Sequence, residues 1–210
     1  MTATLLPPHA PAVVAIVRTD DADSAYRVAR GAWTGGCHAI EITCTTPDAP
    51  RIIATLLDAP DRPAETRIGA GTVRSIADAD AVIAAGAQFV VSPHTNARLL
   101  ERTHAAGRVA IAGAMTPTEI ATAWDCGAHV VKLFPAQRLG VAFLRDVRAV
   151  FPEIPLLPTG GLLRETASEW ITAGAMAVGV GGALGSDDID AIAGRMRLWI
   201  AALSRTEHVG

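Results

Sequence analysis

Short apolar runs alternate with alanine-rich stretches along the whole chain, with a new run about every 20–25 residues. The runs are rich in Val and Ile, which is typical of parallel strands buried on both faces. The pattern predicts eight strands: Ala12–Arg18, His38–Thr43, Arg67–Thr72, Gln88–Ser92, Arg108–Gly113, His129–Phe134, Ile154–Thr159 and Ala175–Val180.

The stretches between the runs carry apolar residues at helical spacing, as in Asp21–Trp33, Asp78–Ala85, Pro117–Asp125 and Glu165–Ala173. Thr46-Pro47 and Thr116-Pro117 each put a hydroxyl before a proline, which predicts an N-cap followed by the first residue of a helix. Glycines shortly before the next strand predict where helices end: Gly35-Gly36, Gly86, Gly107, Gly127 and Gly174.

Eight strand–helix units in succession favour a single closed (β/α)8 barrel, the TIM-barrel class, over an open doubly wound sheet. No linker or change of composition divides the chain. We therefore expect one domain over residues 1–210, with an N-terminal extension at 1–10 and a frayed tail at 204–210.

The composition narrows the class of protein. Half of the residues are hydrophobic, 19% are charged and the net charge is -3, which predicts a folded domain without a nucleic-acid partner. No apolar run approaches the roughly 20 residues that cross a membrane, and prolines early in the chain argue against a signal peptide. Three cysteines without metal spacing are expected to be reduced, mostly buried thiols: Cys37, Cys44 and Cys126. We expect a cytoplasmic protein.

In a barrel of this class the active site lies at the carboxyl ends of the strands, which directs attention to Lys132. A lysine inside an apolar strand must give up hydration of its ammonium group, which favours the neutral amine that attacks carbonyls. The functional interpretation is a nucleophile that forms a Schiff base. The structural alternative is a lysine that reaches the barrel rim or pairs with a carboxylate.

Glu41 stands between two isoleucines in the second predicted strand. A buried carboxylate is costly unless it is paired or used, so Glu41 is a candidate general acid and base. The alternative is an ion pair with Lys132 across the barrel, and both interpretations can hold together.

Further candidates stand at the ends of other strands. Thr72 ends a Gly-Ala-Gly-Thr segment whose small residues let a ligand approach the backbone. Arg18 ends the first strand and could hold a carboxylate or phosphate, or neutralise Glu41. His94 follows the fourth strand, where a plain loop side chain is the simpler interpretation.

Two glycine clusters follow the last two strands. Gly160-Gly161 and Gly181-Gly182 stand where barrel enzymes bind phosphate through backbone N–H groups, although two tight turns without a ligand are the alternative. Together the clusters predict a substrate with an anionic, phosphorylated end.

These residues together resemble the 2-keto-3-deoxy-6-phosphogluconate (KDPG) and 4-hydroxy-2-oxoglutarate (KHG) aldolase family of class I aldolases. The likeness runs in order from about Val13 to Leu184. The segments that carry it are Ala39-Ile-Glu-Ile-Thr43, Ile68-Gly-Ala-Gly-Thr-Val73, Phe89-Val-Val-Ser-Pro93, Gly113-Ala-Met-Thr-Pro-Thr-Glu119, Val131-Lys-Leu-Phe-Pro-Ala136 and Pro158-Thr-Gly-Gly161.

The resemblance implies an aldolase that cleaves a 2-keto-3-deoxy-6-phospho sugar acid into pyruvate and glyceraldehyde 3-phosphate, with no metal or cofactor, as a homotrimer. It implies that Lys132 forms the imine, Glu41 moves protons, Thr72 binds the pyruvate carboxylate and Phe134 packs against the pyruvyl portion. The two glycine clusters would bind the distal phosphate.

The chain departs from the family pattern at three positions. Thr45 stands where some members have an arginine for the carboxylate, and Arg18 could compensate, as in galactonate-type relatives. Ala183 replaces a serine that often helps to hold phosphate, and Ala112 replaces a proline. Galactonate-type, sulfonated and unphosphorylated substrates therefore remain alternatives.

Two different functions compete with this interpretation. A phosphate-binding barrel isomerase or decarboxylase would share the glycine clusters without an imine, although no aspartate stands near Lys132 between Ala128 and Pro135. A catalytically silent barrel would have no reason to keep a buried lysine beside a buried acid.

Overall fold

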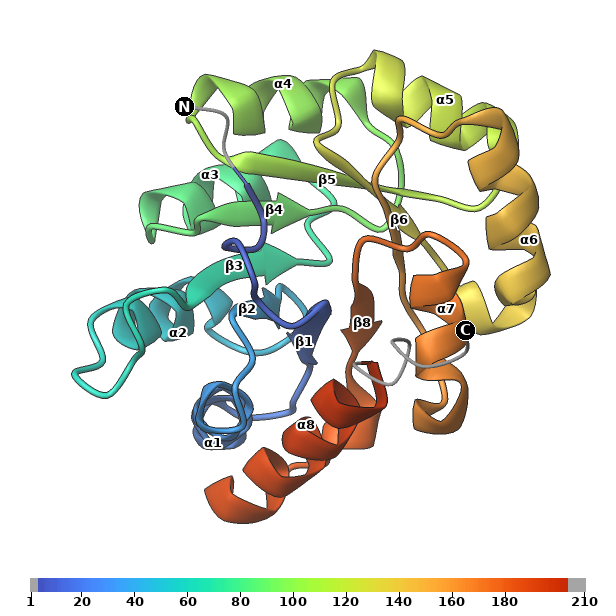
Figure 1. Cartoon of the computed structure of the whole chain (residues 1–210). Coiled ribbons are helices and arrows are strands. Elements are labelled where there is room, and N and C mark those ends of the chain that lie inside the picture. The colour runs from blue at the N-terminus through green and yellow to red at the C-terminus, as the bar shows by residue number, and fades with distance from the viewer. Residues whose placement is uncertain (1–3, 204–210) are drawn as a thin grey trace.

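The computed structural model describes residues 4–203 and forms one (β/α)8 TIM barrel (Figure 1). The strands are β1 (Val13–Val17), β2 (Ala39–Thr43), β3 (Arg67–Gly71), β4 (Phe89–Val91), β5 (Val109–Ala114), β6 (Val130–Leu133), β7 (Leu156–Pro158) and β8 (Val178–Val180). All eight predicted strands are present. All but β5 are shorter than their apolar runs, because the terminal residues of those runs lie beyond the paired part of the sheet, whereas β5 has the predicted length and is shifted by one residue.

The helices are α1 (Ala22–Thr34), α2 (Ala49–Leu57), α3 (Ile76–Ala84), α4 (Ala97–Ala105), α5 (Pro117–Asp125), α6 (Ala136–Val150), α7 (Ala167–Thr172) and α8 (Ile189–Leu203). Short 3-10 turns, η1 (Arg164–Thr166) and η2 (Gly182–Leu184), follow β7 and β8. The predicted tail at 204–210 lies outside the described residues.

The strands are parallel and run in the order β7-β6-β5-β4-β3-β2-β1-β8. The ring closes between β7 and β8 through a bridge of Thr159 with Gly179. Helix α1 lies beside α8 in Figure 1, so the first and last units of the chain are neighbours.

Residues alternate in direction along each strand, as the two-residue period of a strand requires. On β2, Ile40 and Ile42 face the helices and belong to the large apolar layer between strands and helices. The alternate positions of β2 face the barrel interior, where Ala39 joins a second apolar cluster with Val14, Phe89, Val91, Ile111 and Leu157. Leu5, from the predicted N-terminal extension, is buried in this second cluster and covers it.

Local sequence signals set most helix boundaries. Thr116 accepts a hydrogen bond from the Glu119 N–H, and the Glu119 carboxylate accepts one from the Thr116 N–H, so α5 begins with a capping box at the predicted residue. All of the glycines predicted at helix ends except Gly35 adopt positive φ, as in Gly86 and Gly127.

The prediction that a helix begins at Thr46-Pro47 was wrong. Helix α2 begins at Ala49, after Asp48 in the left-handed region with φ 56°. The Thr46 hydroxyl is used elsewhere: it accepts a hydrogen bond from the Thr19 N–H and lies 3.2 Å from the Thr43 hydroxyl. A tertiary contact therefore displaces the local cap.

The cysteines are all free thiols, but the expectation that they are mostly buried holds only for Cys37. Cys44 and Cys126 are half-buried. Burial raises the pKa of Cys37 and Cys44 to about 11, so neither thiol ionises near neutral pH.

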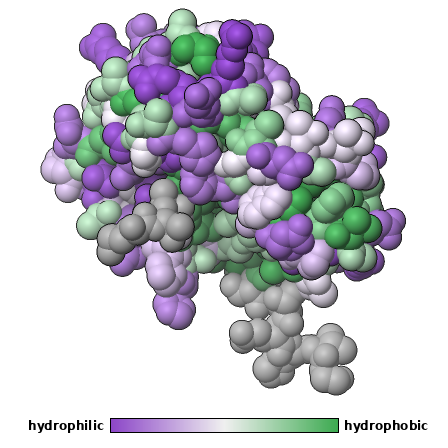
Figure 2. All heavy atoms as spheres, turned by 90° about the horizontal axis from the view of Figure 1, so that it is seen from above, coloured by the Kyte–Doolittle hydropathy of each residue, from purple (hydrophilic) through white to green (hydrophobic). Residues whose placement is uncertain are grey.

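The face of the molecule in Figure 2 mixes hydrophilic and hydrophobic side chains. Exposed large hydrophobic residues include Met115, Phe134 and Leu163 near the carboxyl ends of the strands, and Val150 and Leu198 on helices. Within residues 4–203, no helix is both long and apolar enough to span a bilayer.

Candidate active site

The interior of the barrel brings together two ionisable residues from opposite sides of the ring. Glu41 faces inward from β2 and Lys132 faces inward from β6, because both alternate with residues that face the helices. Their side chains are 1% and 8% exposed, and the Lys132 Nζ lies 3.5 Å from the Glu41 Oε1. The predicted pairing across the barrel is confirmed.

The carboxylate of Glu41 has little other support. Neither oxygen accepts a hydrogen bond within the described part of the chain, although both are buried. A buried carboxylate without hydrogen bonds is costly, so this group is available to a ligand or a proton.

A glycine on the neighbouring strand makes the room for this carboxylate. A Cβ added to Gly71 would overlap the Oε1 of Glu41 and lie too close to the rest of its side chain. The last glycine of the Gly-Ala-Gly-Thr segment, Gly71, therefore leaves room for Glu41 of β2, a role that the sequence alone did not indicate.

Lys132 is the only lysine in the 210 residues. Its Nζ lies 5.7 Å from the centre of the Phe134 ring, and Phe134 is 42% exposed at the mouth of the barrel. The single lysine is a further indication in the sequence of a functional residue. The chain otherwise uses arginine, and its one primary side-chain amine lies inside the barrel.

Arg18 follows β1 and joins two of the predicted binding residues. Its guanidinium donates hydrogen bonds to the hydroxyls of Thr45 and of Thr72, the latter at 2.9 Å. Thr72 has φ 56°, a strained conformation for a β-branched residue that often marks a functional position. Arg18 forms no ion pair with Glu41 within residues 4–203, so the expectation that it neutralises this acid is not met by the described contacts.

A cavity of about 490 Å³ opens at the carboxyl ends of the strands. Seven of the ten predicted site residues line it: Arg18, Lys132, Phe134, Gly160, Gly161, Gly181 and Gly182. Glu41 contacts Lys132, and Thr45 and Thr72 contact Arg18, so all ten belong to one connected group.

The two glycine clusters present unused backbone donors to this cavity. The N–H groups of Gly161, Gly181, Gly182 and Ala183 donate to no acceptor within residues 4–203. By contrast, the N–H groups of Ala136 and Gln137 at the start of α6 donate to the carbonyls of Thr159 and Gly160, which fixes the loop after β7. Free N–H groups in glycine loops are suited to bind an anion.

Several cavity residues were missed by the sequence reasoning. Thr159, Ile16 and Gln137 also line the cavity. Their positions at or just after strand ends could have indicated them, but many residues share that property. His94 is exposed and lies in a separate hollow of about 350 Å³ on the other side of Phe134.

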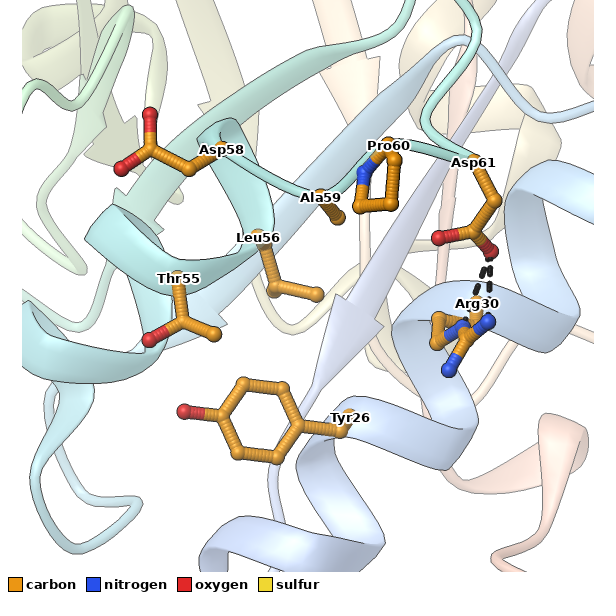
Figure 3. A pocket seen from close by; sticks show the side chains of 8 residues that line it. All are labelled: Tyr26, Arg30, Thr55, Leu56, Asp58, Ala59, Pro60 and Asp61. Atoms are coloured by element: carbon orange, nitrogen blue, oxygen red, sulfur yellow. Dashed lines mark hydrogen bonds and ion pairs between the residues drawn. The ribbon is translucent and has the colours of Figure 1, made fainter.

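A larger hollow of about 610 Å³ lies between α1 and the end of α2, away from the strand ends (Figure 3). Its Arg30 is paired with Asp61 at 2.8 Å, and Tyr26 and Leu56 form its apolar part. None of the predicted site residues lines it, so the smaller cavity at the mouth is the candidate active site. No group of three or more His, Cys, Asp or Glu within the described ranges could hold a metal ion.

Comparison with known proteins gives the same family that the sequence pattern suggests. The family model for KDPG and KHG aldolase matches residues 9–193. The chain belongs to this family. It is an aldolase, an enzyme of the aldehyde-lyase class, and the predicted family is confirmed.

Two similar relatives act on different sugar acids by name. The 2-dehydro-3-deoxy-6-phosphogalactonate aldolase of Escherichia coli (strain K12) is 31% identical over 170 residues, 80% of this aldolase and 82% of the relative. The 2-dehydro-3-deoxy-phosphogluconate aldolase of Treponema pallidum (strain Nichols) is 34% identical over 160 residues, 76% of this chain and 75% of the relative.

A solved structure adds a view of the chemistry in a relative. The KDPG aldolase of Legionella pneumophila, with pyruvate captured at low pH as a covalent carbinolamine intermediate, has 28% identity and a TM-score of 0.76. The match covers 92% of this aldolase and 93% of the Legionella chain.

Proposed function

We propose that this aldolase cleaves a 2-keto-3-deoxy-6-phospho sugar acid of the gluconate type into pyruvate and glyceraldehyde 3-phosphate through an imine on Lys132. The observation that carries the proposal is the buried pair of Lys132 and Glu41, 3.5 Å apart, below a cavity with free anion-binding groups. The covalent pyruvate intermediate in the Legionella relative supports it.

The first half of the reaction forms the imine. The neutral Lys132 amine adds to the C2 carbonyl to give a carbinolamine, and loss of water gives a protonated imine. Arg18 and Thr72 are suited to hold the C1 carboxylate, because the guanidinium and the hydroxyl already lie together beside the cavity.

The second half breaks the C3–C4 bond. Glu41, directly or through a water, takes the C4 hydroxyl proton, the aldehyde leaves, and the bonding electrons pass into the imine to give an enamine. Protonation at C3 and hydrolysis then release pyruvate and the free amine. Phe134, whose ring lies above Lys132, packs against the pyruvyl portion.

The distal phosphate would bind to the N–H groups of the two glycine clusters. Three of these donors, and the adjoining N–H of Ala183, lack a protein acceptor in the described structure, which favours an anionic end over an uncharged one. Gluconate-type and galactonate-type acids are epimers that differ in configuration at C4. Measuring kcat/KM for each acid separately shows which substrate the enzyme prefers.

The test of the mechanism is reductive trapping. Incubation with pyruvate and borohydride should add a reduced pyruvyl group to the peptide that contains Lys132. The single lysine makes the assay clean, because the K132R variant has no side-chain amine left. A folded wild-type protein without an adduct on Lys132 would sink the proposal and favour an imine-free phosphate-binding barrel.

The family resemblance also predicts a homotrimer. Light scattering on the purified protein measures the mass, and a monomer would contradict this prediction.

A further inference from the structure

We propose that Thr43 is a positioning residue for the arginine that binds the substrate carboxylate: its buried hydroxyl completes a chain of hydrogen bonds that holds Arg18 in place. The inference rests on the proposed function, in which Arg18 binds the C1 carboxylate. Thr43 itself does not line the cavity, so it acts only through its neighbours.

Arg18 depends on neighbouring hydroxyl groups for its position. It directly follows β1, lines the cavity, and is exposed. Within residues 4–203 it pairs with no carboxylate, and its guanidinium is held by two threonines: Nη1 donates to Thr45 and Nη2 donates to Thr72. Each of these nitrogens keeps a second hydrogen, so the guanidinium retains the pair of donors that a carboxylate takes.

The hydroxyl of Thr43 connects Thr45 with Thr46. Its oxygen lies 3.1 Å from the Thr45 hydroxyl oxygen and 3.2 Å from the Thr46 hydroxyl oxygen. A threonine hydroxyl offers one donor hydrogen and two acceptor positions, so Thr43 can bond to both neighbours. Both Thr43 and Thr46 are buried, which strengthens these hydrogen bonds and keeps water from replacing them.

The chain of hydroxyls returns to the backbone beside Arg18. The Thr46 hydroxyl accepts a hydrogen bond from the N–H of Thr19, the next residue after the arginine, at 3.2 Å. The Thr46 N–H donates to the Thr43 carbonyl at 2.9 Å, which fixes the turn that carries the three hydroxyls. The side chain of Arg18 and the backbone that follows it are therefore tied to the same turn after β2, and Thr43 joins the two ties.

A purely structural role for Thr43 would have a different consequence. A threonine at the end of a strand often satisfies only the turn that follows, and loss of its hydroxyl would then cost stability alone. A residue that positions Arg18 acts instead on the carboxylate, which is bound both before and during the reaction. Its loss should therefore raise KM for pyruvate and leave kcat nearly unchanged.

The experiment measures aldol addition of pyruvate to saturating glyceraldehyde 3-phosphate in the wild type, T43V, T43S and T103V. Valine keeps the shape of threonine but has no hydroxyl, so we expect T43V to raise KM for pyruvate about 10-fold, with kcat within about 3-fold. T43S restores the hydroxyl and should stay within about 2-fold of the wild type. T103V is the matched control: Thr103 is also buried, donates to the Leu99 carbonyl within α4 and does not line the cavity, so only stability should fall.

A double-mutant cycle with R18Q measures whether Thr43 acts through the arginine. T43V should lower kcat/KM for pyruvate about 10-fold when Arg18 is present and less than about 2-fold in the R18Q background. T45V breaks the same chain at an exposed residue and should give the same pattern, so the test also works if T43V does not fold.

An unchanged KM for pyruvate in T43V or T45V, equal losses with and without Arg18, or a failure of T43S to restore KM would overturn the role of Thr43. Borohydride trapping of pyruvate on the wild type tests the proposed function separately. No trapping removes that function and this inference with it, whereas trapping together with any of the three results above removes only the role of Thr43.

Discussion

The proposed chemistry of this aldolase rests on two side chains that lie in unusual surroundings. Lys132 and Glu41 contact each other inside a barrel that is otherwise apolar, and Glu41 has no hydrogen bond within the described residues. A buried carboxylate without hydrogen bonds does little to stabilise the fold, which supports the proposal that it serves the reaction.

Glu41→Gln should separate the two halves of the reaction. The amide keeps the size of the side chain but cannot take a proton, so kcat for cleavage should fall about 10²–10⁴-fold. Pyruvate should still be trapped on Lys132, because imine formation uses the amine. Steady-state kinetics and mass spectrometry measure the two steps, and near-normal cleavage by E41Q would contradict the assigned role.

Gly71→Ala should disturb Glu41 without changing any ionisable group. The new methyl group would overlap the Glu41 carboxylate, so the Glu41 side chain must leave its present position beside Lys132 or the backbone must shift. We expect kcat to fall about 100-fold and the free energy of unfolding to fall by about 1–3 kcal/mol. Gly182→Ala is the control for stability, because a Cβ there meets no atom within 4 Å. Wild-type activity in G71A would show that this glycine does not position the acid.

The sequence indicated which residues lie together in the candidate site, but not which neighbours hold them in place. Lys132 and Glu41 could be identified because a charged residue in a buried strand contradicts its own surroundings. The need for Gly71 and the position of Gln137 could not, because each depends on a neighbour from another strand or loop. Sequence spacing does not determine such contacts until the register between strands is known.

At the scale of elements, local signals and tertiary contacts compete for helix boundaries. Helix α5 begins at the predicted residue because Thr116 and Glu119 satisfy each other. The same Thr-Pro pattern at Thr46 fails, because the hydroxyl contacts Thr43 and the backbone of Thr19 instead. A cap is therefore predictable only where no other element uses the capping group.

The contact between α1 and α8 gives a prediction for two glycines. A Cβ on Gly31 of α1 would lie 2.6 Å from the Ile192 Cβ of α8, whereas a Cβ on Gly194 of α8 meets nothing within 4 Å. Gly31→Ala should therefore lower the free energy of unfolding by about 1–3 kcal/mol. Gly194→Ala should raise it by about 0.5–1 kcal/mol, because alanine is the better helix former. Urea denaturation of both variants measures this, and equal effects would mean that the helices do not pack closely at Gly31.

At the scale of the whole molecule, the two ends of the barrel carry different groups of residues. The carboxyl ends of the strands line the candidate active-site cavity, while the opposite end holds the tilted rings of His104 and His129, whose centres are 4.6 Å apart. The Nδ1 of His129 accepts a hydrogen bond from the Ala110 N–H, so this nitrogen carries no proton. Burial of the ring and the nearby His104 hold the pKa of His129 below its usual value.

Acid should therefore weaken the fold through His129. In the unfolded chain this histidine takes up a proton as the pH falls through its ordinary pKa near 6.5, but the folded form resists protonation. Its contribution to stability is complete above that pH and is lost below it. The unfolding temperature should drop between pH 7.5 and 5.5, and by less in H129Q. H94Q changes an exposed histidine at the other end and should behave like the wild type, so an equal effect of the two variants would contradict the assignment.

The closure of the barrel has a consequence for how the protein is made. β1 is bordered by β8, and α1 packs on α8, so the first unit of the chain is completed by the last. Arg18 and Gly182 likewise reach the same cavity from the two ends of the sequence. During synthesis, the early units leave the ribosome with one side of β1 and α1 still uncovered. The cavity can therefore form only after the unit of β8 and α8 has left the ribosome and packed against the first unit.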